Sequence, residues 1–165
     1  MDISREISPS WVGDIHHMYT HYGFHTSMEN MDDETRRKHL AFRMDLLKEE
    51  VGETLDAFSV GDPEELVDGL VDICVIALGT LDLYDIDAQK AWKSVLRANL
   101  QKRVGIKEGR PNPYGLPDLV KPEGWQAPSH EDNHGLFDCI HVNKRQSDSE
   151  ENEFQGLGRT IGSSI

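Results

Sequence analysis

The stretch that decides the fold runs from Glu49 to Leu78 and reads EEVGETLDAFSVGDPEELVDGLVDICVIAL. Near its middle, Gly61 ends one helical pattern and Asp62-Pro63 starts the next, because aspartate caps helices well and proline suits the first helical position. The pattern before Gly61 has apolar residues every three or four positions, at Leu40, Met44, Leu47, Val51, Leu55 and Phe58. From Leu66 to Leu81 the chain is apolar almost all round, which predicts a central helix. The short connection predicts that these two helices pack antiparallel.

Two further helices are expected on either side of this pair. Ser8-Pro9 predicts a helix start, and apolar residues at helical spacing continue to Gly23. Asp87 is the expected cap of a last helix that runs to Gly105. The sequence therefore predicts an all-α fold, a bundle of four to five helices, in residues 1–105.

Two segments after the predicted bundle differ from it in composition. Residues 106–128 are rich in proline and glycine, which excludes a long helix and predicts an arm that packs on the bundle, anchored by Leu116, Leu119 and Trp125. Residues 129–165 are polar and acidic, which predicts a disordered or weakly attached tail.

Charge and composition exclude several classes of protein. Lys and Arg number 17 against 30 Asp and Glu, a formal charge of −13 in 165 residues, which disfavours binding to nucleic acid or anionic lipid. The apolar run Leu70–Leu78 is too short to span a bilayer, and the N-terminus lacks the core of a signal peptide. Cys74 and Cys139 are too few for a disulfide framework. We therefore expect a cytoplasmic protein, in the host cytoplasm if it is viral.

The acidic residues of the two central helices are the informative feature. Glu49, Glu50 and Glu53 fall within about 100° of arc beside the apolar stripe. Taken alone, they fit an ordinary solvated face equally well.

The acids of the following helix are harder to explain as surface charge. Glu65, Asp68 and Asp72 share one face, and Asp72 lies in the apolar run VDICVIAL. A carboxylate in such a place needs a cation, a donor or a proton. Antiparallel packing would bring both acidic faces to one pocket, where Mg²⁺ or Mn²⁺ would relieve the crowding of like charges.

EEVGE followed by EELVD and GLVD resembles the EExxE…ExxD signature of the all-α nucleoside triphosphate pyrophosphohydrolases, a superfamily that includes MazG, dimeric dUTPases and phosphoribosyl-ATP pyrophosphohydrolase. The resemblance extends over roughly residues 10–126. LGTLDLYDID resembles the segment that ends the family's third helix. KPEGW resembles the phosphoribosyl-ATP pyrophosphohydrolase-like and phage MazG-like branch. The gap between Glu53 and Glu65 is slightly shorter than in the family, so the second element is either Glu65–Asp68 or ends at Asp72.

The resemblance implies hydrolysis of a nucleoside triphosphate between its α and β phosphates. It implies that Glu49 or Glu50 serves the attacking water and that the metal ligands come from Glu50, Glu53, Glu65, Asp68 and Asp72. It further suggests a phage (MazZ-type) enzyme acting on dGTP or dATP. The alternatives are a phosphoribosyl-ATP pyrophosphohydrolase of histidine biosynthesis and a non-catalytic acidic protein that binds metal or a basic partner.

Substrate contacts are expected from three parts of the chain. Asn99 and Lys102 resemble family residues that reach the phosphates, although an ordinary amphipathic face explains them equally well, and Lys121 is either phosphate-facing or a loop lysine. Residues of the first helix, Ile15, His16 and Tyr19, are expected to line the nucleotide pocket or a dimer seam, or to be ordinary core.

Two further features concern metal and assembly. His17, His21 and His25 follow an i, i+4, i+8 pattern, but no thiolate completes a zinc site, so this stripe is not the favoured metal site. The helices carry more apolar surface than one small bundle covers, and members of the family assemble from such bundles. A homodimer or homotetramer is therefore expected.

Overall fold

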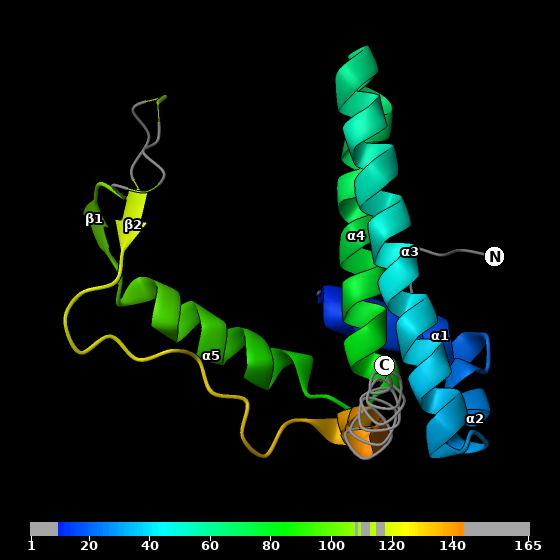
Figure 1. The fold of residues 1–165 in the computed structure, drawn as a ribbon. Coiled ribbons are helices and arrows are strands. Elements are labelled where there is room, and N and C mark those ends of the chain that lie inside the picture. The colour runs from blue at the N-terminus through cyan, green and yellow to red at the C-terminus, as the bar shows by residue number, and fades with distance from the viewer. Residues whose placement is uncertain (1–9, 108, 110–112, 115–117, 144–165) are drawn as a thin grey trace, which may run out of the picture.

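The computed structural model describes residues 10–107, 109, 113–114 and 118–143, and the predicted helix start at Ser8-Pro9 lies outside them. Five α-helices make up most of the described chain (Figure 1). They are α1 (Trp11–His21), α2 (Phe24–Glu29), α3 (Asp33–Val60), α4 (Pro63–Leu83) and α5 (Ala88–Leu100). The strands β1 (Arg103–Gly105) and β2 (Asp118–Val120) pair antiparallel, and the 3₁₀ segment η2 spans Gly135–Asn143. The predicted all-α class is confirmed.

The α3–α4 pair forms where the sequence predicts it. Gly61 adopts a left-handed conformation, φ 73°, at the end of α3, and the Asp62 carboxylate accepts hydrogen bonds from the backbone N–H groups of Glu64 and Glu65. With Pro63 in the first turn, this tight connection lays the two longest helices side by side and antiparallel, with α1 crossing α4 (Figure 1). The relative positions of the acidic residues on α3 and α4 therefore depend on the turn at Gly61–Pro63.

A short helix that was not predicted follows the first helix. α1 ends at His21, Gly23 takes a left-handed φ of 71°, and α2 follows over six residues. The apolar spacing predicted a single helix up to Gly23 and missed α2. The change of direction places His25 on a different helix from His17 and His21, so the three histidines do not form one continuous stripe.

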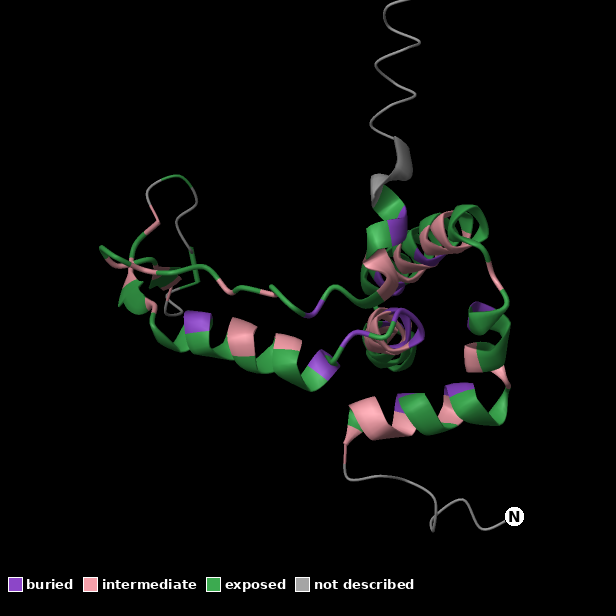
Figure 2. Ribbon diagram, turned by 90° about the horizontal axis from the view of Figure 1, so that it is seen from below, coloured by how far each residue is buried: buried purple, intermediate pink, exposed green. Residues whose placement is uncertain are grey.

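The hydrophobic core lies at the end of the bundle where α1, α2, α4 and η2 meet (Figure 2). Tyr84, just after α4, is fully buried, and its hydroxyl donates a hydrogen bond to the backbone oxygen of Arg36 at 2.6 Å. The buried members of the core are Ile15, Tyr19, Met28, Leu83, Tyr84, Ile86 and Cys139. This end is therefore the part of the single chain with a closed apolar interior.

Part of the predicted tail belongs to this core, which corrects the expectation for residues 129–143. Leu136 donates its backbone N–H to the Tyr84 carbonyl at 2.8 Å, Asn133 bonds both the N–H and the C=O of Asp87, and Cys139 is buried. The few apolar residues of η2 are enough to hold this segment in place because they pack against the end of a core that the helices already form. Residues 144–165 of the predicted tail lie outside the described residues.

The arm contacts α5, the last helix of the predicted bundle. α5 leads away from the other helices and ends at the β1–β2 hairpin, while the chain after β2 runs back beside α5 (Figure 1). Trp125 donates its indole N–H to the Ala98 carbonyl at 2.7 Å, and the Ser94 hydroxyl donates to the Ser129 carbonyl at 2.8 Å. The return segment therefore packs on α5. Leu119 is exposed, and Leu116 lies outside the described residues.

Large apolar side chains remain exposed on the outer faces of the single chain. On α3, Leu55 is 60% and Phe58 70% exposed, and on α4, Val67 is 64% exposed. On α5, Trp92 is 64% exposed. The predicted apolar stripe of α3 thus points largely away from α4, because more polar residues occupy the helix contact.

Candidate active site between α3 and α4

The face of α3 that meets α4 combines polar and small residues. Arg43, Glu50, Thr54 and Ala57 recur at spacings of seven, four and three, so they share one side of the helix. Arg43, Thr54 and Ala57 are buried and Glu50 is half-buried. A carboxylate therefore lies in the contact between two helices, at a position where an apolar residue is normal.

The charges of four other carboxylates act on Glu50, and we call Glu49, Glu50, Glu53, Asp68 and Asp72 the acidic seam. Burial raises the pKa of the Glu50 carboxyl above its ordinary value. The charge of Asp72 raises this pKa further, and smaller contributions come from Glu53, Glu49 and Asp68. Glu50 is thus surrounded by like charges from both helices.

The two acids of α4 that face Glu50 differ in exposure. Asp72 is half-buried and has the largest charge effect on Glu50, whereas Asp68, one turn earlier, is exposed and has the smallest. Glu65 lies in the first turn of α4 and is exposed. The charge of Asp72 therefore raises the pKa of Glu50 more than the charge of Asp68 does.

The backbones of α3 and α4 approach each other closely at the level of the seam. A Cβ atom on Gly69 would overlap the side chain of Thr54, so glycine is what lets α4 lie so near α3 at this level. Thr54 also donates its hydroxyl to the backbone oxygen of Glu50 at 2.7 Å. The helix spacing around Glu50 is therefore set by one small residue and one short polar residue.

Arg43 is a buried cation that the sequence analysis did not single out. Its guanidinium donates to the Thr80 hydroxyl at 3.0 Å, the Tyr19 hydroxyl at 3.0 Å and the Ile76 carbonyl at 2.8 Å. These partners tie α3 to α1 and α4, two turns before Glu50 on the same face. The spacing of seven between Arg43 and Glu50 was the available signal, but a lone arginine on a charged helix gave no reason to expect burial.

The seam has the chemistry of a hard-cation site. Its donors are all carboxylate oxygens, the set that Mg²⁺ and Mn²⁺ prefer. The raised Glu50 pKa shows that this place favours added positive charge, as a proton or as a cation. Glu50 and Asp72, together with Glu53, Asp68 and Glu49, are the residues that would hold Mg²⁺ here. The donor set therefore fits the predicted metal.

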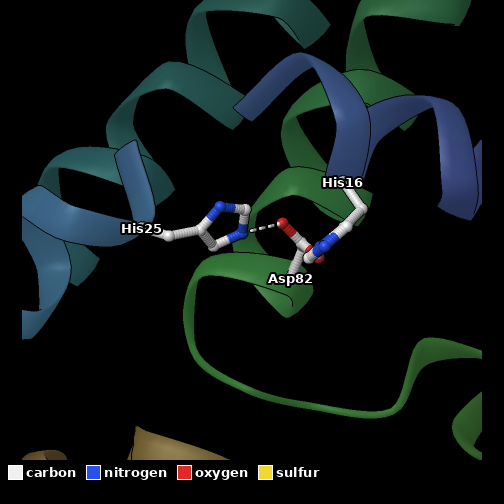
Figure 3. A group of neighbouring side chains, drawn as sticks. All are labelled: His16, His25 and Asp82. Atoms are coloured by element: carbon white, nitrogen blue, oxygen red, sulfur yellow. Dashed lines mark hydrogen bonds and ion pairs between the residues drawn. The ribbon is translucent and has the colours of Figure 1, made fainter. Parts of the chain in front are cut away.

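The predicted residues of α1 have other surroundings. Ile15 and Tyr19 are 7% and 4% exposed and belong to the hydrophobic core, and the Tyr19 hydroxyl bonds Arg43. His16 is exposed and lies beside Asp82 and His25 (Figure 3). Among the described residues, these three are the one group of His, Cys, Asp or Glu with ligand atoms all within 4.8 Å of one another. Neither Asp82 nor its link to two histidines was predicted.

The predicted phosphate contacts lie at the end of α5 and in the arm. Asn99 is exposed in the last turn of α5, and Lys102 follows that helix. The Nζ atoms of Lys121 and Lys102 stand 4.3 Å and 5.9 Å from the centre of the Trp125 ring. The arm extends away from α3 and α4 (Figure 1), so one chain alone does not bring these residues to the acidic seam.

In the described part of the chain, no helix combines the length and the apolar composition needed to cross a membrane.

A comparison with known proteins finds a family model that matches slightly less than half of the chain. Residues 21–99 match the family model described as phosphoribosyl-ATP pyrophosphohydrolase, a member of the all-α MazG-like superfamily. The matched range contains the whole acidic seam. Members of this family are pyrophosphohydrolases that act on phosphoanhydride bonds and are generally metal-dependent, and the match confirms the predicted enzyme class. No curated protein and no solved structure matches the chain.

Proposed function

We propose that this chain, whose residues 21–99 carry the helical segment of the phosphoribosyl-ATP pyrophosphohydrolase family, is a metal-dependent nucleoside triphosphate pyrophosphohydrolase. Water hydrolyses the bond between the α and β phosphates, which gives a nucleoside monophosphate and pyrophosphate. The observation that carries the proposal is the position of Glu50, half-buried between two helices and surrounded by the other four carboxylates of the seam. A triphosphate is an anion, so a strongly acidic site binds it through cations.

The residues of the seam have distinct roles in this proposal. Glu50, Glu53 and Asp72 hold Mg²⁺ or Mn²⁺, with Asp68 and, more remotely, Glu65 completing the set. Bound metal neutralises phosphate charge and lowers the pKa of water. Glu49, exposed next to Glu50, orients the attacking water and accepts its proton, and Glu50 shares this role.

The substrate we favour is a purine deoxynucleoside triphosphate, dGTP or dATP. This choice is supported by the resemblance of KPEGW to the phage MazG-like branch. With such a substrate, the enzyme would control the composition of the nucleotide pool. Phosphoribosyl-ATP is the second candidate substrate, because the matching family model carries that description. Both substrates present the same α–β phosphoanhydride bond, so the seam chemistry is common to them.

One assay separates these substrates. The purified full chain is incubated with each of the eight common NTPs and dNTPs, or with phosphoribosyl-ATP, in Mg²⁺ or Mn²⁺, and products are separated by chromatography. Monophosphate and pyrophosphate, lost with EDTA and restored by excess Mg²⁺, support the proposal. Turnover of phosphoribosyl-ATP alone makes it the substrate. Without turnover of any substrate, the chain is a non-catalytic acidic metal-binding or interaction protein.

We also propose that the active enzyme is a homodimer or homotetramer. Leu55 and Phe58 on α3 and Trp92 on α5 form apolar faces that a second copy would cover. In such an assembly Asn99, Lys102 and Lys121 of one arm reach the acidic seam of a neighbouring chain, where their charge and hydrogen bonds suit the phosphates.

Light scattering after gel filtration tests the assembly. Phe58→Lys is expected to shift the chain to monomer and to lower turnover, whereas Ser59→Lys, at the adjacent exposed position, leaves the oligomer intact. A monomeric and fully active wild-type chain would contradict this part of the proposal and leave the hydrolysis proposal standing.

A further inference from the structure

Three side chains with ligating atoms meet at the end of α4, away from the acidic seam. His16 comes from α1, His25 from α2 and Asp82 from the last turn of α4 (Figure 3). The Nδ1 atom of His16 is 2.8 Å from Oδ1 of Asp82, and Nε2 of His25 is 2.7 Å from Oδ2. Three separate helices thus aim two imidazoles at the two oxygens of one carboxylate.

The donor set of this cluster differs from that of the seam. Two imidazole nitrogens with one carboxylate suit Zn²⁺ and its transition-metal neighbours, whereas all-oxygen sets suit Mg²⁺ and Mn²⁺. The ligand atoms all lie within 4.8 Å of one another, so small side-chain shifts would bring all three to the bond lengths of about 2.0–2.2 Å around a single ion. The chemistry and the spacing therefore point to one borderline transition metal.

A second contact orients one of these ligands. The Thr20 hydroxyl lies 3.3 Å from Nδ1 of His25, the ring nitrogen that faces away from Asp82. When Nδ1 carries the proton and donates to Thr20, Nε2 is left with its lone pair directed at the cluster. A hydrogen bond to the non-ligating nitrogen is the usual support of a metal-bound histidine.

The cluster is also accessible to ions. It lines a cleft of about 740 Å³ that Arg36, Glu29 and Asn133 border as well. The His16 side chain is 63% exposed and that of Asp82 is 14% exposed, so one ligand faces solvent while the carboxylate sits at the base. Three protein ligands leave a coordination position free on the cleft side, as in zinc sites that keep a water or an exchangeable ligand.

We propose that His16, His25 and Asp82 bind one transition-metal dication, with Zn²⁺ as the expected ion, at a site distinct from the acidic seam. Asp82 follows Asp72 by about 15 Å along α4, at 1.5 Å per residue. The bound ion joins α1 and α2 to the end of α4 and keeps an open position toward the cleft. This inference does not rest on the proposed hydrolysis.

Co²⁺ absorption spectroscopy on the full chain tests the site, with Glu50→Gln/Asp72→Asn as a background that weakens competing binding at the seam. A site with two imidazoles and low coordination number gives visible bands that saturate at one Co²⁺ per chain and disappear when Zn²⁺ is added. We expect the bands in the wild type and in this background. We expect them to be lost in His16→Ala and in His25→Ala.

The matched control is His21→Ala, an exposed histidine of the same helix outside the cluster, which is expected to keep the bands. Thr20→Val is expected to weaken Co²⁺ binding by about tenfold or more, through the orientation of His25. Circular dichroism checks the fold of every variant. If the wild type shows no saturable bands, or His16→Ala keeps them while folded, the cluster is a hydrogen-bonded link between helices and the proposal is wrong.

Discussion

Asp72 and Asp82 lie on the same helix but have opposite surroundings. Asp72 faces Glu50 and the other carboxylates of the seam, and its charge is the largest that raises the Glu50 pKa. Asp82 faces two histidines, each within hydrogen-bond distance of one of its oxygens. The charges that raise the pKa of Glu50 are all negative, whereas the histidines of the chain supply hydrogen-bond donors to Asp82. We therefore expect repulsion between carboxylates to lower the stability of the folded state at the seam, and the hydrogen bonds to Asp82 to raise it at the cluster. Such local destabilisation is common where a protein binds a charged ligand.

The largest effect is expected at the centre of the seam. Glu50→Gln keeps the shape of the side chain but removes its charge, so we expect turnover to fall by about 100-fold or more. Release of pyrophosphate in Mg²⁺ measures the loss, and circular dichroism confirms the fold. Glu64→Gln, an exposed carboxylate in the first turn of α4, is the control and should keep full activity. If the two variants were equally active, Glu50 would not take part in catalysis and the catalytic role proposed for the seam would be wrong.

The close packing that brings the seam together is tested with a pair of glycines. Gly69→Ala places a methyl group against Thr54, so we expect the free energy of unfolding to fall by about 1–3 kcal/mol. Gly52→Ala, on the other helix, meets nothing within 4 Å and is expected to stabilise α3 by up to about 1 kcal/mol. Urea unfolding measures both. A similar effect of the two changes would mean that α3 and α4 are not in close contact at Gly69.

The comparison of the two aspartates is tested directly by removing each of them. Asp82→Ala loses the acceptor for both histidines, and we expect a destabilisation on the order of 1–2 kcal/mol. Asp72→Ala removes a like charge next to Glu50 and improves helix propensity, so the metal-free protein should be as stable as the wild type or slightly more stable. Thermal unfolding in EDTA compares them. If Asp72→Ala were less stable than Asp82→Ala, the proposed difference between the surroundings of the two aspartates would be wrong.

The smallest effect is the pH dependence of stability. The folded-state pKa of Glu50 is raised above its ordinary value of 4.5, so the folded protein holds this proton where the unfolded chain has released it. As the pH rises from 4.5 through the raised pKa, the free energy of unfolding of the metal-free wild type falls. Glu50→Gln lacks this contribution and should become relatively more stable over that range. Urea unfolding at several pH values in EDTA checks the sign, and a wild type that gains stability relative to Glu50→Gln over this range would contradict it.

The central helices were predictable because their signals are local. Asp62 and Pro63 start α4 and Gly61 ends α3 through backbone conformation and nearby hydrogen bonds. The i, i+3 and i+4 spacing of the acids placed Glu50 and Asp72 on inward-facing arcs. In contrast, α2 was missed because a helix of six residues after Gly23 is too short to show a periodic apolar pattern. The core role of Cys139 was missed because η2 is short and its surroundings come from Tyr84 and α3.

By itself, the sequence determined the all-α class and the α3–α4 pair, and it drew attention to the acidic residues of both helices, since helix caps and periodicity depend on neighbours along the chain. Only the tertiary structure decided which partners these residues have. It buried Arg43 against Tyr19 and Thr80, and it joined His16 and His25 to Asp82. It also directed the arm away from the seam (Figure 1). These contacts connect residues far apart in sequence, and they depend on how the helices cross, which no local pattern specifies.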